Sequence, residues 1–126
     1  VLSQLKRVIR TNYPNPASHG AQIVNLILSN SEMRTHWEAE VAAMRSRIQE
    51  MRTRFVDKLR EKGVEQDFSF MQRQRGMFSY SGLGPEAVAR LREEFGLYIV
   101  GSGRICLAAL NEQNLDYVCE AIANVL

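Results

Sequence analysis

The chain has 126 residues, of which 45% are hydrophobic and 24% are charged, and its formal net charge is +2. This length suffices for one globular unit with a modest core. No segment approaches the roughly 18 consecutive apolar residues of a membrane span, and the net charge is far below the excess typical of proteins that bind nucleic acid through its phosphates. We therefore expect a cytoplasmic protein with no membrane partner and no nucleic-acid partner.

The two cysteines and two histidines show no arrangement typical of a metal site. Cys106 and Cys119 lie among apolar neighbours without CxxC spacing, and neither histidine stands at a ligand spacing from them. This pattern predicts buried, reduced thiols and argues against a disulfide framework or a zinc site.

The first two elements should be helices joined by a rigid connector. Residues 1–12 carry one apolar stripe, and residues 19–30 are apolar around most of the helix circumference. Two prolines in the run 12–16 fix φ and push their predecessors toward extended geometry, so this connector cannot be helical. The first helix opens in mid-pattern without a capping residue, from which we expect a longer chain on its N-terminal side.

The clearest periodic signal predicts one long helix from about residue 32 to residue 62. Asn30 or Ser31 can cap it, and Gly63 should end it in the left-handed conformation. Charges of both signs on the opposite face predict a solvated surface: Arg34, Arg45, Arg52, Lys58 and Arg60 among Glu38, Glu50, Asp57 and Glu61. Spacings of three and four relate the apolar residues Met33, Trp37, Val41, Met44, Ile48, Met51, Phe55 and Leu59.

Beyond the long helix the pattern changes to short elements. The segments 68–70 and 77–80 predict two strands in a hairpin-like arrangement. A helix should run from Pro85 to Gly96, and Asn111 should cap a last helix after short apolar runs at 97–100 and 105–110. The predicted fold class is therefore α/β of the α+β kind, with helices, one of them long, packed on a small sheet.

The turn Gly-Ser-Gly-Arg at 101–104 delivers Arg104 at the start of an apolar run. An arginine can hold a carboxylate through two parallel hydrogen bonds, and nearby glycines let a ligand approach the backbone closely. Arg104 is therefore a candidate ligand-binding residue, although an arginine paired with a carboxylate of its own chain is the more common arrangement. Position alone indicates a surface residue for Arg10.

The chain contains no recognisable catalytic set. Neither a nucleophile elbow nor a phosphate-binding GxxxxGK[ST] loop is present. The three lysines, Lys6, Lys58 and Lys62, lie on helical patterns where exposure is expected. None of them resembles the desolvated amine of a Schiff-base lysine.

Three segments stand in an order and at separations that match a known family: IRTNYPNPASHGA at 9–21, GMFSYSGL at 76–83 and SGRICLA at 102–108. They resemble the connector, a small-domain strand and the carboxylate-binding strand of class I aminotransferases of the aspartate and aromatic amino-acid group. The similarity covers essentially the whole chain. By this resemblance the chain is identified as the C-terminal portion of such an enzyme.

The resemblance implies a fold-type I enzyme that uses pyridoxal 5'-phosphate and works as a homodimer with its active sites at the subunit boundary. It implies that Arg104 grips the α-carboxylate of the amino-acid or 2-oxo-acid substrate and that Phe78 borders the substrate nearby. It implies that Arg10 reaches the neighbouring subunit's site and pairs with the distal carboxylate of aspartate or glutamate, moving aside for aromatic substrates. The family's Schiff-base lysine would lie upstream of Val1, so we expect the isolated chain to be inactive.

The resemblance divides the chain into a connector and helix at 1–30 and a long helix with a small α/β domain at 31–126. Pro14 and Ala17 depart from residues common in the family, which leaves the connector's part in the partner site open. Ala109 replaces a common glycine, a change that should affect packing more than specificity. A second hypothesis is a stand-alone helical module that binds an acidic partner or nucleic acid through the basic face from Arg45 to Arg60. The sequence favours the aminotransferase.

Overall fold

The computed structural model describes residues 1–13, 15 and 17–126. In this described part the helices are α1 (Leu2–Asn12), α2 (Ser18–Ser29), α3 (Ser31–Glu61), α4 (Pro85–Phe95) and α5 (Leu115–Val125). The strands β1 (Phe78–Tyr80) and β2 (Arg104–Cys106) form a two-stranded sheet, and the 3-10 turns are η1 (Ser69–Arg73) and η2 (Leu107–Ala109). The predicted class, helices with a small sheet, is confirmed.

The chain forms two compact units, residues 1–42 and residues 43–126, and α3 contributes to both. The division at residue 30 stays a prediction. None of the described helices is long and apolar enough to cross a membrane.

The unit 1–42 contains α1, α2 and the first turns of α3, as the sequence predicts. No residue of α1 or α2 is buried. The side chain of Asn30 caps α3, because its Oδ1 accepts a hydrogen bond from the Met33 N–H at 3.0 Å. The predicted rigid connector falls partly on Pro14 and Pro16, which lie outside the described residues.

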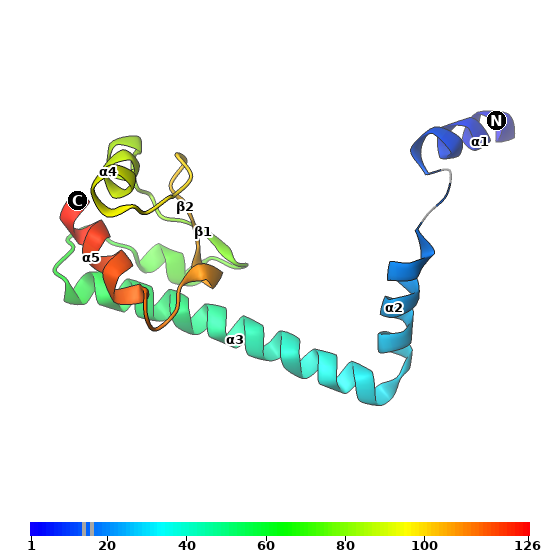
Figure 1. Cartoon of the computed structure of the whole chain (residues 1–126), viewed down its shortest axis with the longest axis horizontal. Coiled ribbons are helices and arrows are strands. Elements are labelled where there is room, and N and C mark those ends of the chain that lie inside the picture. The colour runs from blue at the N-terminus through cyan, green and yellow to red at the C-terminus, as the bar shows by residue number, and fades with distance from the viewer. Residues whose placement is uncertain (14, 16) are drawn as a thin grey trace. The chain divides into compact units, whose positions relative to one another are not determined.

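The unit 43–126 holds the hydrophobic core. Figure 1 shows α5 alongside the C-terminal half of α3 with α4 on its other side, and the sheet next to them. Burial of each large apolar side chain stabilises the unit by about 1.5–3 kcal/mol relative to exposure. The largest fully buried apolar side chains are Phe55, Leu59, Met71, Leu91, Leu107, Leu115 and Ile122.

The long helix ends as predicted. Gly63 has φ of 78°, its N–H donates to the Arg60 carbonyl at 3.0 Å, and the Val64 N–H donates to the Leu59 carbonyl at 3.1 Å. This pairing satisfies carbonyls that the last helical turn would leave free. Gly96 ends α4 in the same left-handed conformation, with φ of 64°.

The predicted strand at 68–70 is wrong, since these residues lead into η1. The Asp67 carboxylate accepts hydrogen bonds from the Ser69 N–H at 2.8 Å and from its hydroxyl at 2.9 Å. Such a side-chain turn competes with extended backbone and starts a tight turn instead. The hairpin is therefore wrong as well: β1 pairs antiparallel with β2, which is more distant in sequence.

Two further boundaries differ from the prediction. The run 97–100 contributes only a bridge from Val100 to Arg104, and the run 105–110 leaves the strand after Cys106 to form η2. Asn111 caps a turn rather than the last helix, because its side-chain oxygen accepts from the Gln113 N–H at 2.9 Å and the helix begins at Leu115. Local side-chain hydrogen bonds thus decide these boundaries.

The solvated face predicted for the long helix is wrong at Arg52, which is only 4% exposed. Lys58 is partly exposed and forms an ion pair with Asp116 at 2.9 Å. Of the cysteines, Cys119 is buried and Cys106 is partly buried, and both are free thiols. Burial raises the pKa of the Cys119 thiol to about 12, so this cysteine is inert near neutral pH.

Candidate carboxylate-binding site

The two-stranded sheet has one covered face and one open face. Ser79 pairs with Ile105 in the register, and both side chains are buried against the core. Because side chains alternate along a strand, the flanking residues Phe78, Tyr80 and Arg104 point to the open face, where all three are exposed.

On this open face Arg104 lies over the aromatic ring of Phe78. The guanidinium carbon is 4.8 Å from the ring centroid, which is cation–π geometry. Phe78 is opposite Cys106 in the register, so it meets Arg104 diagonally across the two strands. No carboxylate of the described residues forms an ion pair with Arg104, so its hydrogen-bond donors remain available to a ligand.

The residue before Arg104 is held by the loop that follows β1. Ser81 is fully buried; its hydroxyl donates to the Gly103 carbonyl at 2.6 Å and accepts from the Leu83 N–H at 3.2 Å. The Ser81 N–H also donates to the Gly103 carbonyl, at 3.0 Å. Gly103 has φ of 76°, and a Cβ there would lie 2.8 Å from the Leu83 carbonyl oxygen. Only glycine fits this position without displacement.

The strand β1 is held on its outer edge by a side chain. The Gln74 amide accepts a hydrogen bond from the Tyr80 N–H at 2.8 Å and donates one to the Tyr80 carbonyl at 2.9 Å. It thereby takes the place of a third strand and satisfies backbone groups that an edge strand otherwise exposes. Arg52 of α3 contacts the same strand from the covered face, with Nη2 3.5 Å from the Ser79 hydroxyl.

The structure brings two of the three predicted site residues together, Arg104 and Phe78. Arg10 lies in the last turn of α1, is exposed, and belongs to the unit 1–42. Its contribution to a substrate site therefore stays a prediction.

Comparison with known proteins shows the family of the chain. Residues 1–122 match the family model described as aminotransferase class I and II. The chain belongs to this aminotransferase family. It is 56% identical to the aspartate aminotransferase of Pseudomonas aeruginosa over 126 residues, covering all of this chain and 32% of that protein. It is 46% identical to the aromatic-amino-acid aminotransferase of Escherichia coli, again covering all of this chain and 32% of the relative.

Solved aminotransferase structures share the fold. One is an aromatic-amino-acid aminotransferase from Burkholderia pseudomallei covalently bound to pyridoxal phosphate, with a TM-score of 0.92 and 59% identity over 99% of this chain and 31% of that one. The chain thus spans about a third of the length of the aminotransferases that it matches.

The lysines of this aminotransferase segment do not fit the Schiff-base role that the cofactor requires. Lys58 pairs with Asp116 at 2.9 Å, and Lys62 pairs with Glu120 at 2.5 Å and with Asp116 at 3.4 Å. The hydrogen bond to Glu120 raises the pKa of Lys62, which keeps it protonated and non-nucleophilic. Lys6 lies on the exposed helix α1.

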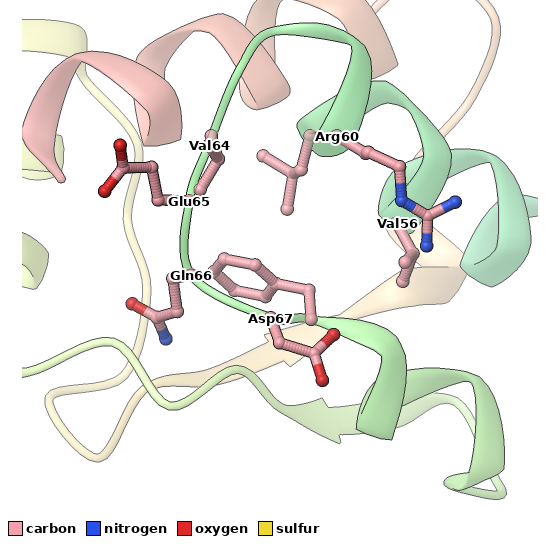
Figure 2. A pocket seen from close by; sticks show the side chains of 8 residues that line it. Val56, Arg60, Val64, Glu65, Gln66 and Asp67 are labelled. Carbon is pink, nitrogen blue, oxygen red and sulfur yellow. The ribbon is translucent and has the colours of Figure 1, made fainter.

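A small pocket lies elsewhere in the unit 43–126, between the end of α3 and the loop before η1. Figure 2 shows Arg60, Gln66 and Asp67 around it. Asp67 is already bonded to Ser69, and these hydrogen bonds lower the pKa of its carboxyl. None of the three candidate site residues lines this pocket, whose walls are Val56, Leu59, Arg60, Val64, Glu65, Gln66, Asp67 and Phe68.

Sequence reasoning missed the residues that support the site: Arg52, Gln74 and Ser81. For Arg52 a signal exists, since it stands four residues after Ile48 and three before Phe55, on the flank of the apolar stripe of α3. Gln74 and Ser81 carry no such signal, because their partners depend on how β1 packs.

Proposed function

We propose that this chain is the substrate-carboxylate-binding portion of a longer, homodimeric, cytoplasmic enzyme that transfers an amino group from aspartate or an aromatic amino acid to a 2-oxo acid. Pyridoxal 5'-phosphate is the proposed cofactor. The observation that carries the proposal is the guanidinium of Arg104, exposed over Phe78 and without an internal acid among the described residues. The names of the similar proteins, aspartate and aromatic-amino-acid aminotransferases, support the substrate class.

The roles of the chain's own residues follow from their chemistry. Arg104 binds the substrate α-carboxylate through a planar fork of two hydrogen bonds, which fixes the plane of the carboxylate. Phe78 holds the guanidinium from one face and limits its motion. Fixing the carboxylate in this way orients the substrate Cα–H bond for proton removal.

Arg10 supplies the second clamp in this proposal. It pairs with the distal carboxylate of a dicarboxylic substrate bound in the neighbouring subunit's site and moves aside when the substrate side chain is aromatic. A clamp at each end of a dicarboxylate restricts rotation of the substrate more than one clamp does.

When bound in the longer protein, pyridoxal phosphate would supply an electron sink for proton removal at the substrate Cα. Because the lysines of this chain do not fit a Schiff-base role, the covalent attachment of the cofactor is assigned to residues outside it.

The decisive experiment is an Arg104→Lys substitution in the longer protein. Lysine keeps the positive charge but loses the fork, so we expect kcat/KM for aspartate and for aromatic amino acids to fall on the order of 10²-fold. Arg92→Lys is the matched control, since Arg92 is an exposed arginine of α4. Unchanged kcat/KM in the Arg104 variant would remove the basis of the proposed function.

The isolated 126-residue chain should not transaminate. It offers no unpaired, desolvated lysine among the described residues for the cofactor. Incubation of the pure chain with pyridoxal phosphate, aspartate and 2-oxoglutarate should yield no sustained formation of glutamate. Repeated turnover by the chain alone would contradict the assignment of the Schiff-base lysine to another part of the protein.

A further inference from the structure

The most unusual side chain outside the site is Arg52 of α3. It is 4% exposed, yet no carboxylate of the described residues forms an ion pair with it. Its Nε is buried without a hydrogen-bond partner in the part of the chain that the structure describes. Burial lowers the pKa of its guanidinium, although an arginine remains charged at neutral pH.

A buried charge of this kind is costly for stability. Removing a guanidinium from water without a counter-ion carries a penalty that neutral acceptors offset only in part. An apolar residue of similar volume usually serves a core position as well or better. A buried arginine at this position therefore points to a role for the backbone and side-chain groups that accept its hydrogen bonds.

Those hydrogen bonds go to the strand that carries Phe78. Nη2 donates to the Gly76 carbonyl at 2.6 Å, and the same nitrogen lies 3.5 Å from the Ser79 hydroxyl. Gly76 has φ of 85° and makes the turn into β1, and Ser79 is the buried residue next to Phe78. One guanidinium thus contacts the turn before Phe78 and the residue after it.

We infer that Arg52 is a positioning residue: it fixes the backbone of β1 so that the Phe78 ring lies under Arg104. The chain of contacts runs from the Arg52 Nη2 to the Gly76 carbonyl and the Ser79 hydroxyl, and from Phe78 across the sheet to the Arg104 guanidinium. Arg52 itself touches no substrate.

The inference is needed because the sheet is short. Each strand has three residues, and the backbone hydrogen bonds beyond them reach only the Met77 carbonyl, bonded to the Leu107 N–H at 2.8 Å, and the Ser81 N–H, bonded to the Gly103 carbonyl at 3.0 Å. The turn at Gly76 lies outside this ladder. Gln74 secures the far end at Tyr80, whereas Arg52 secures the near end at Gly76. Without Arg52, the turn at Gly76 can move and carry the Phe78 ring away from Arg104.

The first measurement is structural and is made on the 126-residue chain without substrate. In the NMR spectrum the δ-methylene protons of Arg104 should show an upfield ring-current shift from Phe78. Arg52→Met should reduce this shift, and Arg52→Lys should reduce it less, because lysine can still donate to the Gly76 carbonyl. Arg45→Met, an exposed position on the same helix, should leave it unchanged.

A loss of stability alone must not imitate this result. Leu59→Ala removes a buried side chain beside the pocket at the end of the same helix, and it is expected to lower stability while leaving the hydrogen-bond partners of Arg52 in place. The Leu59→Ala variant should keep the upfield ring-current shift of the Arg104 δ-methylene protons that the unmodified chain shows. If Arg52→Met does not fold, the Arg52→Lys variant is compared with Leu59→Ala. A folded Arg52 variant with an unmodified Arg104 shift would overturn the inference.

The second measurement is kinetic, is made on the longer protein, and rests on the proposed function. Arg52→Met should raise KM for the amino acid about tenfold through the displaced Arg104, with partial recovery in Arg52→Lys. If Arg104→Lys lowers kcat/KM but Arg52→Met leaves KM unchanged, the positioning role is wrong and the proposed function stands. If Arg104→Lys itself has no effect, the proposed function fails, while the NMR shift still decides the positioning role.

Discussion

At the scale of single residues, the backbone before Arg104 leaves almost no room for a side chain. Gly103 is buried, has φ of 76°, and is bonded through its carbonyl to Ser81. A Cβ at this position would lie 2.8 Å from the Leu83 carbonyl and 3.2 Å from the Ser81 hydroxyl. The position of Arg104 thus depends on the absence of a side chain on its neighbour.

Gly103→Ala should therefore destabilise the chain and displace Arg104. We expect a loss of about 1–3 kcal/mol in the free energy of unfolding, from the left-handed φ and from the contact with the Leu83 carbonyl. Urea unfolding followed by circular dichroism measures the change. Gly101→Ala is the matched control, since nothing lies within 4 Å of a Cβ at Gly101. Equal unfolding midpoints for the two variants would show that the chain around Gly103 adjusts to a Cβ without loss of stability.

At the scale of elements, a ladder of ion pairs joins the C-terminal part of α3 and the residue after it to α5 and the turn before it. Arg54 Nη2 is 2.7 Å from a Glu112 oxygen, and Lys58 and Lys62 pair with Asp116 and Glu120. Each of the three hydrogen bonds joins residues 58 apart in sequence, so the two helices run parallel in a constant register. These ion pairs lie beside the apolar contacts of the core and stabilise the same register of α3 relative to α5.

The ladder predicts a dependence of stability on pH. Hydrogen bonds from Arg54, Lys58 and Lys62 lower the pKa values of Glu112, Asp116 and Glu120, respectively. A carboxyl whose pKa is lower in the folded state stabilises the fold above its unfolded pKa of about 4, and this contribution disappears as the pH falls through the folded value. The ladder should therefore be present at pH 7 and lost in acid.

Asp116→Asn tests this dependence, because Asp116 pairs with both Lys58 and Lys62. At pH 7 the variant should have a slightly lower urea midpoint than the unmodified chain, and the two midpoints should converge in acid, once the pH has fallen below the lowered pKa of Asp116 in the folded state. The difference at pH 7 should also shrink in 1 M salt, since the pairs are exposed. Glu65→Gln, an exposed acid with no ion pair among the described residues, is the control. A difference that persists in acid would mean that Asp116 acts through something other than its charge.

At the scale of the whole molecule, the two compact units differ in how their apolar residues are covered. The core residues all lie between Met51 and Val125, within the unit 43–126. The helices α1 and α2 have no buried residue, and Met33 and Trp37 in the first half of α3 are 45% and 42% exposed. Helices with apolar stripes of this size normally pack against another surface.

The isolated chain should therefore self-associate through the residues 1–42. Sedimentation at increasing concentration should show species larger than a monomer, and a chain of residues 43–126, which keeps all the core residues, should be closer to a monomer. A clean monomer of the 126-residue chain at high concentration would contradict this expectation. Salt should strengthen the association, because the contact is apolar.

The helices could be predicted from the sequence because their signals are local. The spacing of apolar residues predicts α3, Asn30 and Gly63 mark its ends, and Pro85 and Gly96 bound α4. The candidate Arg104 was also recognisable, since a short glycine turn and a family motif surround it. Local patterns in the chain are thus enough to predict the helices and to propose Arg104 as a carboxylate-binding residue.

The pairing of the strands and the burial of charged side chains depend on long-range packing. The partner of β1 is β2, about 25 residues on, and no local pattern specifies that pairing because it forms through packing on the core. The same holds for Arg52, whose charge favours solvent, and for the contact of Arg104 with Phe78. Residues distant in sequence meet only when the core is formed, so their contacts depend on the fold as a whole.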